Sequence, residues 1–159
     1  GLGDVYKRQF LRRSGADITL VRKLFRDDME SYRAKAEIIS SAEVYRNKFA
    51  IARGVDLHIE SPTIIGAQAA NELLDISAIK ASFVLTEYNG RIYVSARSID
   101  EVNVQIIMER LGGGGHINMA GAQLPGISVN EAIRQLSVAA KELQGLSEDL
   151  EKDMSFFTI

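Results

Sequence analysis

The sequence predicts an α/β (α+β) fold, with helices packed on a mixed β-sheet and a helical lead-in before it. Apolar residues recur at the helical period in some segments and alternate in others, which gives the order α-α-β-α-β-β-α-β-α. Asn89-Gly90 joins the two strongest strand candidates, 79–88 and 91–98, as a type I′ hairpin turn. The other connections require crossovers, and hairpins combined with crossovers indicate a mixed sheet.

Capping residues mark the expected helix starts, since Ser, Thr, Asp and Asn satisfy the free amides of a first turn. The expected caps are Asp17, Asp27 with Glu30, Ser61 before Pro62, Ser98 with Glu101, and Ser128 with Glu131. The helices from Asp27 onward are expected to end near Ser41, Leu74, Leu111 and Leu143. Further strands are expected over 44–52 and 119–124.

Composition excludes several classes of protein. The chain has 159 residues, an apolar fraction of 46% and a net charge of −2, so it can bury a core but has no global field that attracts nucleic acid. It contains no cysteine, which excludes disulfides and thiolate metal sites. No apolar stretch approaches the roughly 18 residues that span a bilayer.

Domain boundaries are expected where the periodicity changes. Residues 1–9 do not continue the pattern that follows and are expected to be non-native or disordered. We expect 10–42 to be a helical linker, 43–145 the ligand-binding domain and 146–159 a tail. The absence of an initiator methionine suggests a fragment of a longer protein.

The most informative segment is the run Gly112-Gly113-Gly114-Gly115 followed by His116. Glycine is tolerated where the backbone needs positive φ or where another group approaches closely, and bound phosphate is the commonest such group. The following histidine adds a donor for a phosphate oxygen or a base. A flexible loop with an incidental histidine is the alternative interpretation.

Arg97 and Ser95 are further candidates because they share one face of the strand 91–98. That face also carries Arg91 and Tyr93, whereas the opposite face is apolar. The planar guanidinium of Arg97 suits phosphate. The alternative is a solvated outer face with a surface salt bridge.

The titratable residues do not form a metal site. The chain has two histidines, and His58 is expected to be a surface or structural residue. A two-metal hydrolase needs converging carboxylates and imidazoles. We therefore expect no metal ligand in this chain.

The segment Ser95-Ala96-Arg97-Ser98, the glycine run with His116, and Ala120-Gly121 together resemble the DHH-associated domain, the substrate-binding half of DHH phosphoesterases. The resemblance covers about 42–143. The segments 15–21 and 118–123 resemble membrane-anchored cyclic di-AMP phosphodiesterases of Gram-positive bacteria. Gln123 stands where oligoribonuclease relatives have an aromatic residue.

The resemblance implies roles for these residues. Arg97 would pair with a substrate phosphate with help from Ser95, Gly112–Gly115 would let the nucleotide lie close, and His116 would contact phosphate or base. An upstream DHH domain would hold two manganese ions for in-line hydrolysis to pApA, and the parent would be anchored with this domain at the cytoplasmic face of the membrane. The chain has no Asp-His-His triplet, so the resemblance implies that it holds no catalytic residue and is inactive alone. Because it also lacks the membrane helices that the resemblance implies for the parent, we expect a soluble fragment that makes no membrane contact.

Two alternatives remain. One is a nucleic-acid-binding module of a DHH exonuclease or oligoribonuclease, which needs a basic surface and stacking aromatics. The near-neutral charge, with Tyr93 as the only aromatic close to the motif, opposes it. The other is a regulatory nucleotide-binding domain. The sequence leaves homodimerisation and the preference among cyclic di-AMP, cyclic di-GMP and short RNA open.

Overall fold

A computed structural model describes residues 2–13, 15, 17–24, 26, 28–99 and 102–155. The chain divides into two compact units, Gly1–Tyr32 and Arg33–Ile159. The first contains helices α1 (Leu2–Arg13) and α2 (Ile18–Leu24) and the start of α3 (Met29–Ser40). The second contains the sheet, and with it every candidate site residue.

The second unit is built on one mixed six-stranded sheet with the strand order β1-β2-β3-β4-β6-β5. Strands β2 and β3 are parallel, and all other neighbours are antiparallel. This arrangement confirms the predicted fold class. The strands are β1 (Glu43–Tyr45), β2 (Phe49–Gly54), β3 (Ala81–Tyr88), β4 (Arg91–Ser98), β5 (Gly114–His116) and β6 (Met119–Pro125).

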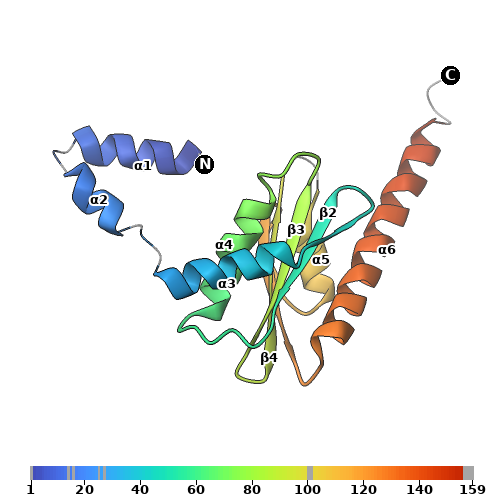
Figure 1. The fold of residues 1–159 in the computed structure, drawn as a ribbon. Helices are drawn as coiled ribbons and strands as arrows, with labels where there is room; N and C mark the ends of the chain where they lie inside the picture. Colours follow the sequence, from blue (N-terminus) through green and yellow to red (C-terminus); the bar gives the residue numbers. More distant parts are fainter. Residues whose placement is uncertain are drawn as a thin grey trace. The chain divides into compact units, whose positions relative to one another are not determined.

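Helices cover both faces of this sheet (Figure 1). Helix α4 (Pro62–Leu73) forms the crossover between β2 and β3 and packs with α3 around Ile38, Leu73 and Val84. Helices α5 (Val104–Arg110) and α6 (Val129–Ser155) pack on the other face. The sheet has one hydrophobic core on each face, because successive side chains of a strand point to opposite faces. Phe83 and Val84 are neighbours on β3 and belong to different cores.

Helix α4 covers only part of its face. It packs on β2, β3 and β4. On β6, by contrast, Met119 is 53% exposed and Gln123 is also exposed. The part of the sheet around β4, β6 and β5 therefore presents an accessible surface beside the helix.

Local turns confirm some sequence predictions. Asn89 and Gly90 have φ values of 51° and 73°, as the type I′ turn requires. Asp17 accepts from the amide of Thr19, and Ser128 accepts from that of Glu131, so both act as caps. Ser61 precedes Pro62 at the start of α4, but its side chain makes no capping hydrogen bond.

Two predicted elements have different bounds. The single strand expected over 44–52 is a hairpin of β1 and β2, because Arg46 and Asn47 adopt φ values of 50° and 60° and reverse the chain. The last helix was expected to end near Leu143 but continues to Ser155. Gly145 lies inside it, which a helix tolerates at a cost of about 1 kcal/mol.

Two predicted caps also need correction. Ser98 does not cap a helix, because its hydroxyl donates to the carbonyl of Val102 and holds the turn after β4. Helix α5 is capped instead by Asn103, which accepts from the amide of Ile106. Asp27 and Glu101 lie outside the described residues. Helix α3 is capped by Asp28, which accepts from the amide of Ser31.

Candidate functional site

The strand register brings the candidate side chains onto one surface. Directly opposite residues of antiparallel strands point to the same face. Arg97 lies opposite Met119, which lies opposite His116. Ser95 lies opposite Gly121, which lies opposite Gly114, and Tyr93 lies opposite Gln123. We call this surface the open face: Tyr93, Ser95, Arg97, Gly114, His116, Met119, Gly121 and Gln123.

An open pocket of about 460 Å³ lies on this face. Its lining residues are Thr63, Tyr93, Val94, Ser95, Gly112, Gly113, Gly121, Ala122 and Gln123. Ser95, Gly112 and Gly113 were predicted from the sequence, whereas Arg97, Gly114, Gly115 and His116 do not line this pocket. The structure therefore places all the predicted residues near one surface but only some of them in one depression.

The four glycines have different structural roles. Gly112 has a φ of 83° directly after the C-cap of α5, where a left-handed residue ends a helix. A Cβ atom on Gly113 would lie 2.1 Å from the carbonyl oxygen of Gly121, so this position is needed for close packing on β6. Gly115 has a φ of 145° and a similarly close contact with Ala120. Only Gly114 combines open space with an ordinary φ.

Arg97 is the most distinctive polar residue of the open face. Its Nε donates to Oδ1 of Asn71 at 3.0 Å, and its Nη1 donates to the carbonyl of Ala96 at 2.9 Å. No carboxylate in the described part of the chain pairs with it, so the surface salt bridge of the alternative interpretation is absent there. Partial burial lowers the pKa of the Arg97 guanidinium from its usual value, but arginine still carries its charge at neutral pH.

His116 is exposed on the same face of the sheet as Arg97. Its strand lies two inter-strand spacings from that of Arg97, about 10 Å between backbones, with Met119 between them. The turn before Met119 is fixed because Nδ2 of Asn118 donates to Oγ of Ser98 at 3.0 Å. Extended ligands that carry more than one polar group fit this spacing better than a single small ion.

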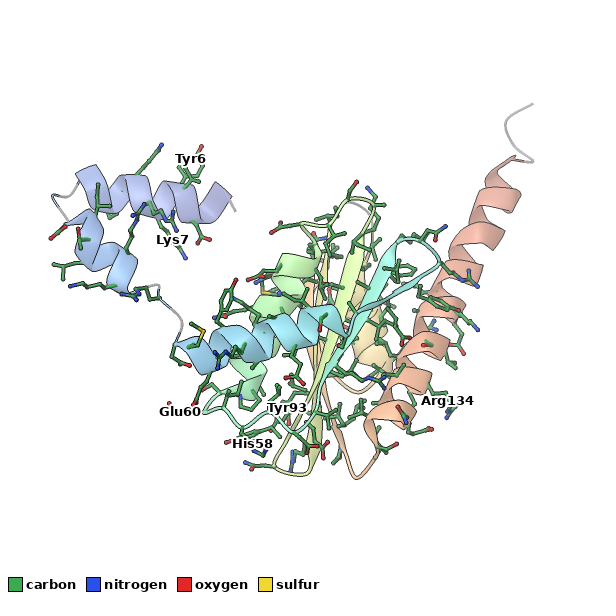
Figure 2. All side chains as sticks on the ribbon, viewed as in Figure 1. Tyr6, Lys7, His58, Glu60, Tyr93 and Arg134 are labelled. Atoms are coloured by element: carbon green, nitrogen blue, oxygen red, sulfur yellow. The ribbon has the colours of Figure 1, made fainter. Side chains whose placement is uncertain are left out.

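Aromatic side chains mark the other end of the open face. Tyr93 packs against Tyr88 with 6.3 Å between ring centroids. His58 and Glu60, in the loop between β2 and α4, are labelled near the same end of the sheet in Figure 2. Both are exposed and neither lines the pocket, which agrees with the surface role expected for His58.

Sequence reasoning did not identify Thr63, Asn71 and Gln123 as site residues. Thr63 and Gln123 line the pocket, and Asn71 holds Arg97. The polar Gln123 in an alternating strand was a usable signal for its exposed face. No pattern in the sequence indicates that α4 lies beside β4, so Thr63 and Asn71 had no comparable signal.

The described residues do not form a metal centre. No three His, Asp or Glu side chains among them gather closely enough to hold an ion. We therefore derive no metal-dependent step from this chain. Among its described helices, none has the length and apolar character needed to cross a membrane.

Comparison with known proteins gives a consistent picture. Residues 48–144 match the DHHA1 domain. The chain is 44% identical to the cyclic-di-AMP phosphodiesterase GdpP of Geobacillus thermodenitrificans, over 82% of this chain and 20% of that protein. It is 40% identical to the cyclic-di-AMP phosphodiesterase PdeA of Listeria monocytogenes, over 80% of this chain and 19% of that protein. The chain thus spans about a fifth of the length of these curated relatives.

A solved structure supports the fold. An exopolyphosphatase-related protein from Bacteroides fragilis superposes with a TM-score of 0.75 at 22% identity, covering 90% of this chain and 44% of that chain. At this identity the likeness concerns the fold alone.

Proposed function

The chain belongs to the DHHA1 domain family, and on that premise we propose that it is the substrate-binding part of a cyclic di-AMP phosphodiesterase. The relatives at 40% and 44% identity carry that activity in their names. The open face provides a surface on which an anionic nucleotide can be held. The proposal extends the relatives' substrate class to this chain.

The observation that carries the proposal is the half-buried Arg97 on the open face. A guanidinium that is partly removed from water and lacks a carboxylate partner in the described residues leaves its charge available to a ligand. Phosphodiester oxygens match its planar donors, and such charge-assisted hydrogen bonds are stronger than neutral ones. The nearby pocket adds volume for the rest of a nucleotide.

The remaining residues of the open face contribute binding and orientation. Gly114 and Gly121 have no side chains, so a ligand can lie against the strand backbone there. We assign a phosphate contact to Arg97 with help from the Ser95 hydroxyl, and a phosphate or base contact to the exposed His116. Held at several points, a substrate is fixed for attack by groups outside this chain.

We assign the reaction itself to a separate domain of the parent polypeptide. We propose that residues 43–145 bind substrate and that 10–42 link them to a DHH domain of the same polypeptide. That domain would hold the metal ions, two manganese in our proposal, in a parent anchored at the cytoplasmic side of the membrane. By this assignment the chain alone is inactive.

Titration of cyclic di-AMP into the ¹⁵N-labelled chain, followed by NMR, tests the proposal. We expect shifts in the amides of Gly112–His116 and in the Nε–H signal of Arg97. Arg97→Ala should weaken binding by about 1.5–3 kcal/mol, roughly 10- to 150-fold, since it removes hydrogen bonds to a charged group. Arg134→Ala is a matched control, because Arg134 lies on α6 and pairs with Glu131 away from the open face (Figure 2).

Each outcome decides a specific point. Binding that is unchanged in Arg97→Ala would remove Arg97 from the site. An absence of shifts on the open face at millimolar cyclic di-AMP would overturn the proposal that this chain holds a substrate site. Tighter binding of a short oligoribonucleotide than of cyclic di-AMP would favour the nucleic-acid-binding module instead.

A further inference from the structure

We infer that Asn71 is a positioning residue that orients Arg97 toward an anionic ligand without neutralising it. The inference rests on the proposed function, because it specifies how the arginine of that site is prepared. It is carried by the hydrogen bond from Nε of Arg97 to Oδ1 of Asn71 at 3.0 Å. Asn71 comes from α4, the helix whose Thr63 also lines the pocket on the open face.

The end of α4 is built so that Asn71 is fixed beside β4. The amide of Leu74 donates to the carbonyl of Asn71, which tightens the last turn. The carbonyl of Ala70 instead accepts from the hydroxyl of the buried Ser82 at 2.5 Å. Ser82 lies directly opposite Arg97 in the β3–β4 register. Helix α4 is therefore anchored to the sheet one residue before Asn71 and one strand away from Arg97.

The two protein contacts of Arg97 fix the plane of its guanidinium. Nε donates to Asn71 and Nη1 donates to the carbonyl of Ala96, the preceding residue on β4. A guanidinium has five N–H donors and two are used here, so one donor of Nη1 and both donors of Nη2 remain without an acceptor in the described part of the chain. An oriented group with unused donors loses less conformational freedom when an anion binds.

The neutral charge of the Asn71 side chain is the critical property. An amide oxygen accepts the Nε–H as a carboxylate would, but it leaves the net charge of Arg97 intact. A carboxylate at this position would form an ion pair with a half-buried guanidinium and compete with the phosphate of a ligand. An amide at position 71 therefore leaves the positive charge of Arg97 available to an anionic ligand, whereas a carboxylate there would neutralise it.

Two substitutions at this position separate charge from packing. Asn71→Asp keeps the shape and the acceptor but adds a negative charge, so cyclic di-AMP affinity should fall about as far as in Arg97→Ala, roughly 10- to 150-fold. Asn71→Ala keeps the charge balance and only frees the arginine, so the loss should be smaller, roughly 2- to 12-fold. Thermal stability should follow the opposite order, with Asn71→Asp at least as stable as Asn71→Ala.

Asn130 offers a matched control, because its Oδ1 accepts from Nη1 of Arg53 at 3.3 Å, away from the open face. Asn130→Asp should leave cyclic di-AMP affinity unchanged. The Nε–H signal of Arg97 in the NMR spectrum provides a direct readout. It should move in Asn71→Ala without ligand, while the signals of β6 stay in place.

The possible results separate this inference from the proposed function. Asn71→Asp binding like the unmodified chain, while Arg97→Ala binds weakly, would overturn the positioning role and leave the proposed function standing. A larger affinity loss in Asn71→Ala than in Asn71→Asp would assign Asn71 a packing role only. Unchanged affinity in Arg97→Ala would overturn the positioning role and remove Arg97 from the site, whereas the absence of ligand-induced shifts on the open face would overturn the proposed function.

Discussion

Gly113 is expected to be a glycine of the run on which folding depends. A Cβ atom at this position would lie 2.1 Å from the carbonyl oxygen of Gly121 and 2.7 Å from Cα and Cβ of Ala122. Ordinary contacts of this kind lie at 3.4–4 Å. Gly113→Ala therefore requires the glycine loop and β6 to separate by more than an ångström.

The expected size of the effect follows from which atoms collide. The obstructing atoms belong mainly to the backbone of β6, which is paired with β4, so no side-chain rotation relieves the contact. Overpacking costs about 1–3 kcal/mol, and a backbone collision places this case near 3 kcal/mol. With about 2–4 °C lost per kcal/mol in a chain of this size, Tm should fall by about 6–12 °C.

Gly114→Ala is the matched comparison in the assay. Its Cβ meets nothing within 4 Å and its φ is not in the left-handed region. Its unfolding free energy should stay within about 1 kcal/mol of the unmodified chain, with a gain from the less flexible unfolded state. Urea denaturation followed by circular dichroism measures both variants, and cyclic di-AMP titration of Gly114→Ala should show weaker binding because a methyl group then occupies the open face.

This reasoning is refuted if Gly113→Ala does not lose more stability than Gly114→Ala. Gly113→Ala as stable as the unmodified chain would mean that the loop does not pack on β6 as described. A larger loss of stability in Gly114→Ala than in Gly113→Ala would lead to the same conclusion.

Two other substitutions have clear expectations. His116→Ala should weaken cyclic di-AMP binding and leave Tm unchanged, because His116 is exposed; a strongly lowered Tm would show a core role instead. Arg134 lowers the pKa of Glu131 to about 2 from 4.5 by donating to its carboxylate. Since the folded pKa lies below the unfolded one, the stabilisation is present above pH 4.5 and is lost as pH falls toward 2. The Tm difference between the unmodified chain and Glu131→Gln should shrink over that window in thermal scans, and a constant difference would contradict the linkage.

Local signals in the sequence predicted much of the fold. The alternation of β4 and the Asn89-Gly90 turn depend on neighbouring residues, so the hairpin and its polar face were predicted correctly. The reversal at Arg46 and Asn47 was missed, because neither residue is a glycine and positive φ at both is uncommon. The cap at Asn103 was missed because Ser98 offered a stronger local pattern.

The site was predictable only where it lies on one segment. Arg97 and the glycine run could be selected by residue type, but the separate roles of Gly113 and Gly114 depend on their distance from β6. The contact between Asn71 and Arg97 depends on how α4 lies on the sheet. The position of a helix on a sheet is set by the packing of the whole core, so no periodic pattern in the sequence predicts it.

The parallel pairing of β2 and β3 has a consequence for the order of folding. The β3–β4 hairpin closes through two residues and belongs to a class that forms in about 1–10 μs. The parallel pair requires the whole crossover through α4, whose loop-closure entropy slows its formation. Asn71 reaches Arg97, 26 residues away, only when this crossover is in place. We therefore expect the hairpin strand that carries Arg97 to form before Asn71 orients that arginine.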